Sequence, residues 1–371
     1  MKRFFISLLV LLAFDMRKVS AQEFTAEGEV VYKIFYGVGG TVSYQLHKHF
    51  LIKRSGAQWF IQTSNENDKY KDEDADIYFY REAGCDGTNV FWLSKNNINP
   101  STNQTAEADD KKPVDVIATI TAGIVPNFDE NVTLISPVWL AYASKPYFDK
   151  VNDGKVKHAD HVSDEVFFNE TVPAEWQISP EAPEFIQAIT YHHDGMTLKR
   201  TQDGEIKVAY PKPYDRGFIS PRFSSDEYTN IDGFSIPMHF KLDMIIPSIE
   251  STNVFKVAAS VEGHLTGFSR QVDIQSFYPE IVGKALVTDN RFLNKGMKDF
   301  AYVAKQGGPW LQVGDTNLEK FVNYYERYYA KKLASKPPLT ASTKRFIIIP
   351  FIVLNIAFFV WLLLRLRRRN N

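Results

Sequence analysis

The sequence has almost no cysteine and no recognisable catalytic motif. Cys85 is the only cysteine among 371 residues, so the chain cannot form an intramolecular disulfide. Animal ectodomains of this size usually contain disulfides, so the sequence favours a bacterial origin. The GxSxG, HExxH, Walker A and dinucleotide-binding motifs are all absent. The sequence therefore gives no support to an enzymatic activity or a cofactor, although a hydrolase with an unrecognised site stays open as an alternative.

Long apolar runs are missing except at the two ends of the chain. Near the N-terminus, a basic pair at 2–3 precedes an apolar run at 4–14, and small residues follow at 19–21. This order is typical of a secretory signal, and the run is too short to span a bilayer. The sequence predicts a signal peptide over 1–21 that is cleaved after Ala21, with an uncleaved anchor as the alternative.

The second apolar run lies near the C-terminus. Residues 346–364 carry no charge, and as a helix they would extend about 28 Å, close to the hydrocarbon thickness of a bilayer. The tail at 365–371 contains four arginines, whereas only two basic residues come just before the run. This excess of positive charge predicts that the tail faces the cytoplasm. The sequence predicts a transmembrane helix over 346–364 after a juxtamembrane spacer at 336–345. Removal of this segment by a sorting enzyme stays open.

The part between the two ends is acidic. Without the signal and the residues from 344 onward, it holds 33 basic and 43 acidic residues, a net charge of about −10. Such a charge argues against nucleic acid or anionic lipid headgroups as partners of this part. The expected partners are the membrane in which the chain is anchored, together with a lipid or another envelope protein. We expect the domain at 22–335 to lie outside the cytoplasm, in a bacterial periplasm or on the cell surface.

Alternating apolar and polar residues predict strands through most of this domain. The clearest run is 234–244, and 255–265 and 42–52 repeat the pattern. Asp-Gly pairs, which suit tight hairpin turns, occur between such runs at 86–87, 153–154, 194–195, 203–204 and 232–233. Strands with one apolar and one polar face normally form antiparallel sheets. The predicted fold is therefore mainly β (α+β), a large antiparallel sheet built of successive hairpins with a few helices.

Helical patterns are few. Thr316 and Glu319 form a capping box that opens an amphipathic helix over 317–334. A shorter helix is expected over 136–148, broken by Pro146. The polar stretch 99–113 is interpreted as a mobile loop.

The exported part resembles the LolA/LolB-like superfamily of bacterial lipoprotein carriers. The resemblance depends on long amphipathic hairpins after a signal peptide, on the hairpin Tyr228–Pro237 and on the tyrosine-rich segment Ile77–Tyr80. It implies a curved antiparallel sheet that wraps around helices and shelters a cavity for acyl chains. The chain departs from the family because it is longer and ends in a predicted anchor, which a diffusible carrier cannot have. No functional residue is carried over.

Histidines and the single cysteine give only weak candidates for chemistry. His158 and His161 could bind a metal if their segment were helical, but the neighbouring Asp-Gly pair favours a solvated loop. His47 and His49 alternate onto one face of a strand, where exposed histidines are the simpler interpretation. Cys85 precedes an Asp-Gly turn, where a thiol could be exposed, but no histidine lies near it in sequence to activate it.

The apolar face of the sheet admits two interpretations. It is either a filled core, or the lining of a cavity that holds an apolar, lipid-like ligand. The candidate lining residues are Phe234, Ile236, Met238, Phe240, Tyr44 and Leu46. The leading function is a membrane-anchored, non-enzymatic binding or envelope module that holds such a ligand, and a purely structural domain is the alternative beside the hydrolase.

Overall fold

The structure is a computed structural model that describes most of the central part of the chain. The described residues are 23–36, 40–65, 81–94, 116–126, 134–152, 171–201, 204–231, 233–247, 255–270, 277–281, 283–295, 297 and 300–334. The predicted signal peptide, the loop at 99–113, the tyrosine-rich segment 77–80 and everything after 334 lie outside these ranges. None of the helices within them is both long and apolar enough to cross a membrane.

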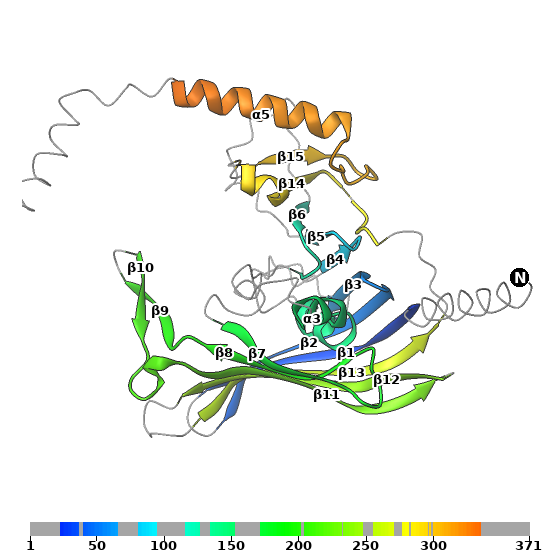
Figure 1. The fold of residues 1–371 in the computed structure, drawn as a ribbon, viewed down its shortest axis with the longest axis vertical. Coiled ribbons are helices and arrows are strands. Elements are labelled where there is room, and N and C mark those ends of the chain that lie inside the picture. The colour runs from blue at the N-terminus through cyan, green and yellow to red at the C-terminus, as the bar shows by residue number, and fades with distance from the viewer. Residues whose placement is uncertain are drawn as a thin grey trace, which may run out of the picture. The chain divides into compact units, whose positions relative to one another are not determined.

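The chain folds into one large sheet, which confirms the predicted mainly β fold (Figure 1). Thirteen strands pair in the spatial order β15-β14-β6-β5-β4-β3-β2-β1-β13-β12-β11-β8-β7. The strands are β1 (Glu23–Tyr36), β2 (Thr41–Ser55), β3 (Gln58–Asn65), β4 (Arg81–Cys85), β5 (Asn89–Ser94), β6 (Val116–Ala122), β7 (Thr171–Ile178), β8 (Ile186–His193), β11 (Phe218–Ile231), β12 (Phe234–Pro247), β13 (Phe255–Ser269), β14 (Ala285–Asp289) and β15 (Ala301–Ala304). Neighbouring strands are antiparallel except β14, which lies parallel to β6.

Tight turns join several neighbouring strands, as the Asp-Gly pairs predicted. Gly87 and Gly233 both have positive φ, of 92° and 76°, and they stand between β4 and β5 and between β11 and β12. Gly204 opens the second strand of a separate hairpin, β9 (Met196–Thr201) with β10 (Gly204–Ala209). Asp194-Gly195 differs from the prediction, because it connects β8 to β9, which belong to different sheets. The pair at 153–154 lies outside the described residues.

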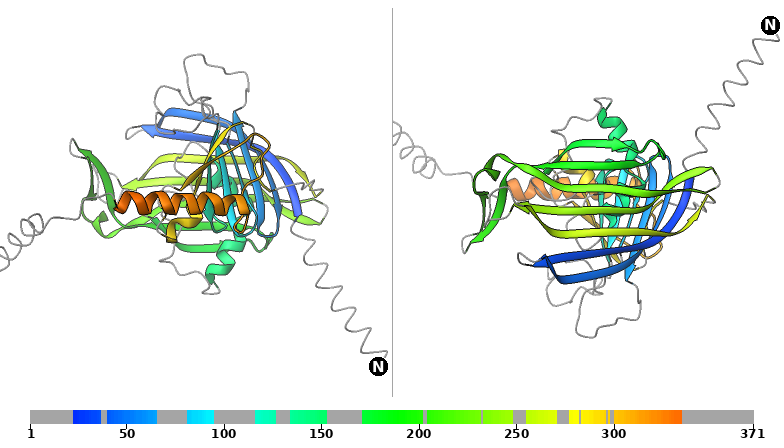
Figure 2. Two further views of the ribbon diagram at one scale, coloured as in Figure 1. Left: turned by 90° about the horizontal axis from the view of Figure 1, so that it is seen from above. Right: turned by 90° about the horizontal axis from the view of Figure 1, so that it is seen from below.

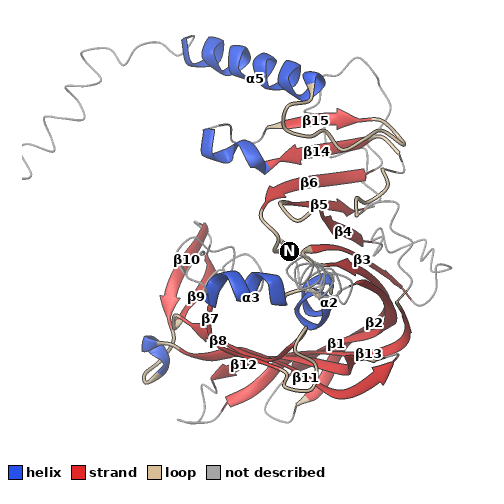
Figure 3. Ribbon diagram, turned by 45° about the vertical axis from the view of Figure 1, so that its right-hand side comes forward, coloured by secondary structure: helices blue, strands red, loops and turns tan. Residues whose placement is uncertain are grey.

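One face of β1–β3, β8 and β11–β13 carries the main hydrophobic core, and we call it the inner face. Two short helices, α2 (Ile135–Tyr142) and α3 (Lys145–Asn152), lie on this side, which is the concave side of the curved sheet (Figure 3). The helix expected over 136–148 is thus two helices, and Pro146 stands in the first turn of α3, where proline is tolerated. On the opposite face of these strands, here called the outer face, no helix described among the residues up to Trp310 lies across the strands when the sheet is seen from below (Figure 2, right).

The alternation along β12 is confirmed, but that along β13 is not maintained to its start. Phe240 and Leu242 are buried on the inner face, and so are Val261 and Leu265. Phe255 and Val257, expected on the same apolar face, are instead 45% and 37% exposed. The register between β12 and β13 shifts at Met244/Ile245, so an extra residue on β13 interrupts the alternation there.

Two glycines in the middle of the inner face leave room for two phenylalanine rings. Phe50 on β2 is the register partner of Gly28 on β1, and Phe240 on β12 is the register partner of Gly263 on β13. A Cβ added to Gly263 would stand 2.0 Å from the Phe240 ring, and one added to Gly28 would stand 2.6 Å from the Phe50 ring. The two rings therefore lie over the glycine backbones and meet above β1 and β13, with centroids 6.2 Å apart.

A second hydrophobic core lies on the opposite face of β4, β5, β6 and β14. In β4, Ala83 and Cys85 belong to the main core, whereas Gly84 faces the segment around Phe277. Phe91, the register partner of Gly84, makes edge-to-face contacts with Tyr278 and Trp310 at centroid distances of 4.7 and 5.3 Å. Strands β4 and β5 are thus covered on both faces, with the main core on one side and the second core on the other.

The described chain forms two compact units, one up to Trp310 and one from Leu311 onward. In the second unit, α5 (Thr316–Ala334) occupies the range in which an amphipathic helix was predicted. Its first helical hydrogen bond runs from the Glu319 N–H to the Asp315 carbonyl at 3.0 Å. Asp315 is therefore the N-cap residue, one position before the threonine of the predicted capping box. The remaining described helices are the short 3₁₀ turns η3 (Tyr214–Arg216) and η4 (Asn290–Lys295).

The glycine at position 263 gives a first testable prediction. Gly263→Ala should lower the free energy of unfolding by about 1–3 kcal/mol, because its Cβ meets the Phe240 ring, which is fully buried and cannot move away freely. In a Phe240→Leu background the cost of the same change should be smaller, since the contacting ring is gone. Denaturant unfolding of the four proteins measures this coupling. Thr229→Ala at an exposed strand position is the control, and equal costs in both backgrounds would contradict the argument.

Candidate functional site

The inner face is the candidate functional site, and the predicted lining residues all lie on it. Phe234, Ile236 and Phe240 are buried in the main core, and Met238 and Leu46 pack against it with part of their surface exposed. Tyr44 is 41% exposed. The structure therefore places these residues on one face but not at one spot: Phe234 packs on Phe24 at one end of β1, whereas Tyr44 is paired with Ile34 at the other end.

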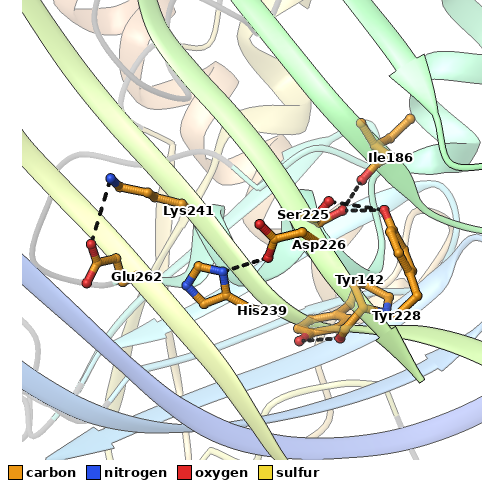
Figure 4. Close-up of polar contacts among 9 residues, drawn as sticks. Tyr142, Ile186, Ser225, Asp226, Tyr228, His239, Lys241 and Glu262 are labelled. Atoms are coloured by element: carbon orange, nitrogen blue, oxygen red, sulfur yellow. Dashed lines mark hydrogen bonds and ion pairs between the residues drawn. The ribbon is translucent and has the colours of Figure 1, made fainter.

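Helix α2 fills the middle of the inner face. All eight of its residues are buried, and the Tyr142 ring packs on Phe50 and Phe240 at centroid distances of 5.9 and 5.8 Å. The Tyr142 hydroxyl donates a hydrogen bond to the Pro237 carbonyl at 3.2 Å (Figure 4). The ring is therefore held by packing and the hydroxyl by this hydrogen bond. Its complete burial raises the pKa of the Tyr142 hydroxyl far above the usual range, which keeps it a neutral donor.

The inner face is longer than the helix that covers it. A strand with the 15 residues of β2 extends about 50 Å, whereas a helix with the eight residues of α2 extends about 12 Å. Beyond α2, Tyr44 lies opposite Ile34 in the register, and their neighbours Leu46 and Tyr32 are also paired. Leu46 and Ile34 are half-buried, and the Tyr32 and Tyr44 rings meet edge-on at 6.4 Å. This end of the face presents apolar and phenolic surface that no part of α2 covers.

One of the largest buried side chains of the inner face is a cation. Arg54 is 1% exposed, and its guanidinium donates hydrogen bonds to the backbone carbonyls of Tyr142 at 3.0 Å and Glu184 at 3.1 Å. Desolvation lowers the pKa of Arg54 to about 10, while the nearby carboxylates of Glu184 and Asp149 oppose that shift. Arg54 therefore binds the C-terminal end of α2 to the sheet, because that end of a helix has carbonyls without intrahelical partners.

The sequence interpretation missed Arg54 and Tyr142, although a signal for the first was present. Arg54 has the same parity along β2 as Phe50 and Ile52, so the period of two places it on the apolar face. Long cations at such positions are buried when backbone carbonyls or carboxylates pair with them. No comparable signal existed for Tyr142, because its partners on β2 and β12 are separated from it by about ninety residues on each side.

The histidines singled out from sequence do not form a metal site among the residues that the structure describes. His47 and His49 lie on the outer face of β2, and His47 is hydrogen-bonded to Gln45. Within the described ranges, no three His, Cys, Asp or Glu side chains are grouped to hold an ion. His158 and His161 lie outside those ranges, so the solvated loop expected there stays a prediction, with the metal site as its alternative.

Cys85 is not exposed, contrary to what its position before a turn suggested. Its side chain is fully buried in the main core, and the Gly87 N–H donates to its sulfur at 3.2 Å. Burial raises the pKa of the Cys85 thiol to about 12. A buried, protonated thiol is a poor nucleophile, so Cys85 is a core residue.

The fold and the site define a class of protein: a mainly β protein whose long antiparallel sheet curves around a short buried helix. No family model matches the chain, and no curated protein matches it. A LolA superfamily protein from Nitrosomonas europaea is similar in structure over 71% of this chain and 95% of its own, with 6% identity and a TM-score of 0.29. It belongs to the superfamily that the sequence resembles. A DUF1329 family protein from Desulfovibrio piger is similar over 71% of this chain and 92% of its own, with 12% identity and a TM-score of 0.27. TM-scores this low transfer neither function nor residue roles.

The burial of Arg54 gives a second prediction. Arg54→Leu should lower the free energy of unfolding by about 2–4 kcal/mol, because two buried carbonyls lose a charged donor. Arg222→Leu, which removes an exposed arginine from the outer face of β11, should stay within about 0.5 kcal/mol of the parent protein. Thermal and denaturant unfolding measure both. Equal effects would mean that Arg54 does not fix α2 to the sheet.

The raised pKa of Cys85 gives a third prediction. With a folded-state pKa of about 12, only about one thiol in ten thousand is ionised near pH 8, so alkylation of the folded protein should be very slow. Unfolding returns the thiol to an ordinary pKa and exposes it, and modification by iodoacetamide should then finish within minutes. Intact-mass spectrometry counts the modified molecules. Rapid labelling under native conditions would show that Cys85 is accessible after all.

Proposed function

We propose that this protein holds an apolar, lipid-like ligand against the inner face of its curved sheet. One observation carries the proposal: the apolar inner face continues beyond α2, and Tyr44, Leu46 and Ile34 keep part of their surface exposed there. Contiguous exposed apolar surface is often the site at which a ligand or partner binds. The uncovered end of the face supplies surface that an apolar ligand can bury.

The shape and chemistry of this end favour an acyl chain over a compact ligand. The exposed positions follow the direction of the strands, so a ligand that buries them is extended along β1 and β2. Met244 on β12 and Ala259 on β13 lie in the same row across the sheet as Ile34 and Tyr44, but both are buried and add no exposed surface to it. Burial raises the pKa of the Tyr32 hydroxyl and the neighbouring Tyr44 adds to this shift, so Tyr32 stays neutral and is suited to accept or donate a hydrogen bond to an ester or amide group.

The proposal includes a place for the protein in the cell. The sequence pattern at 1–21 supports export, and the apolar run at 346–364 with the arginines after it supports an anchor whose tail faces the cytoplasm. A binding domain held at the surface of a membrane would act on lipids or lipid-modified molecules within reach of its anchor. We infer that it retains or presents an acylated ligand in a bacterial envelope.

Native mass spectrometry with lipid extraction tests this function, on residues 22–343 secreted into a bacterial periplasm. The expected result is a co-purified acyl-containing molecule. Tyr44→Asp or Leu46→Asp should reduce its occupancy at least tenfold, because a carboxylate placed against an apolar chain costs more than about 1.4 kcal/mol. Gln45→Asp is the matched control, since Gln45 is the residue between them and is exposed on the outer face.

Two outcomes would contradict the proposal. If the protein carries no lipid, and binds none when offered vesicles or detergent-free fatty acid, the exposed end of the inner face is not a lipid-binding site. A loss of ligand in Gln45→Asp as large as that in Tyr44→Asp would place the ligand elsewhere or show a general effect on folding.

A further inference from the structure

The outer face of the sheet carries a row of titratable side chains in register across five neighbouring strands. His239 on β12 is paired with His264 on β13 and with Asp226 on β11. His264 is paired in turn with Glu29 on β1, and Glu29 is paired with His49 on β2. These residues are far apart in sequence, and only the pairing of the strands brings them together. Register partners point to the same face with Cβ atoms about 5 Å apart, so adjacent members of the row can reach a common ion.

His239 is hydrogen-bonded to a carboxylate in the way that is common for histidines that bind metals. Its Nδ1 lies 2.7 Å from Oδ1 of Asp226, and the contact is drawn in Figure 4. Since the carboxylate can only accept, Nδ1 donates, which leaves Nε2 as the lone-pair nitrogen when the imidazole is neutral. A histidine that binds a metal normally donates its other ring N–H to a carboxylate or carbonyl, which fixes both the ring and the tautomer. Asp226 therefore prepares His239 to bind through Nε2.

The charges around the two histidines favour a cation. Asp226 stands on one side of the pair and Glu29 on the other, in the same row. The nearest lysine along β12, Lys241, lies 3.8 Å from Glu262 (Figure 4). It also lies 3.2 Å from Asp243, so its charge is already paired with carboxylates. His264 and Glu29 are exposed, and their side chains can turn toward an ion without leaving a packed position.

We propose that His239 and His264 form a two-histidine site for a divalent transition-metal ion such as Zn²⁺, with Asp226 as the residue that orients His239. Imidazole is a ligand that such ions prefer, and Zn²⁺ completes its coordination with water or a carboxylate when the protein supplies few ligands. Glu29, the next residue in the row, is the carboxylate within reach. Among the described residues no three such donors are grouped, so the proposed site depends on the two histidines alone and on side chains that turn toward the ion.

The proposal is independent of the proposed function, because the row lies on the outer face and the apolar strip on the inner face. The histidine pair at His47 and His49 is the competing location. Those two residues alternate along β2, and the cross-strand partner of His47 is Val31, which provides no ligand. A test therefore has to separate the two pairs.

The experiment is a zinc titration of the full-length chain without a histidine tag, in detergent, followed by competition with a fluorescent zinc indicator. The expected result is one saturable Zn²⁺ per chain at neutral pH. His264→Ala and His239→Ala should each weaken binding at least tenfold, and Asp226→Asn should weaken it about tenfold because the orienting acceptor is lost. His47→Ala should leave the affinity unchanged. Acidification to about pH 5.5 should weaken binding in the parent protein, since protonated imidazole cannot ligate.

Each of the other outcomes would overturn part of the proposal. Binding that survives His264→Ala but is lost in His47→Ala would assign the ion to the pair on β2. Absence of saturable binding would remove the site altogether, and unchanged affinity in Asp226→Asn would remove the role of Asp226. Unfolding temperatures recorded in a chelator should agree among the variants, because all these residues are at least partly exposed. His264→Asn, a polar substitution of similar size, replaces His264→Ala if the alanine variant is destabilised.

Discussion

The structure depends on two phenylalanine rings that lie over two glycines. Phe50 and Phe240 come from strands separated by β1 and β13, and they can meet only because Gly28 and Gly263 have no side chains between them. Any Cβ at those positions would overlap the rings. Tyr142 of α2 packs on this pair of rings. The packing site of α2 on the sheet therefore exists because both positions are glycine.

Two polar side chains are also buried where α2 packs on the sheet, and each has specific hydrogen-bond partners. Arg54 pairs with carbonyls at the end of α2, and the Tyr142 hydroxyl pairs with a carbonyl of β12. A buried guanidinium is costly unless it is hydrogen-bonded, so its position specifies where α2 ends against the sheet. The helix is short and has no side-chain hydrogen bond at its N-cap, which means that tertiary contacts, and not helix propensity, hold it in place.

The two faces of the curved sheet have different chemistry. The inner face is mainly apolar apart from the buried cations Lys48 and Arg54, is covered in the middle and is open at the Tyr44 end, whereas the outer face is charged and carries several histidines. On β2, β12 and β13, the histidines at 47, 49, 239 and 264 lie on the outer face. A ligand on one face and an ion on the other would not compete for space. Farther along the sheet, at β4 and β5, both faces are buried, so neither kind of site extends there.

The sequence by itself determined the local features of this protein. Alternation of apolar and polar residues located β2 and β12, Asp-Gly pairs located three of the turns, and the amphipathic pattern at 317–334 located α5. Local patterns suffice for these features because period and turn conformation depend on neighbouring residues. The tertiary structure alone decided the exposure of Phe255 and Val257, the burial of Cys85, and the alignment of His239 with His264. Each of these depends on which strands pair, in which register, and on what packs above them, and a pattern within one strand contains no information about its partner.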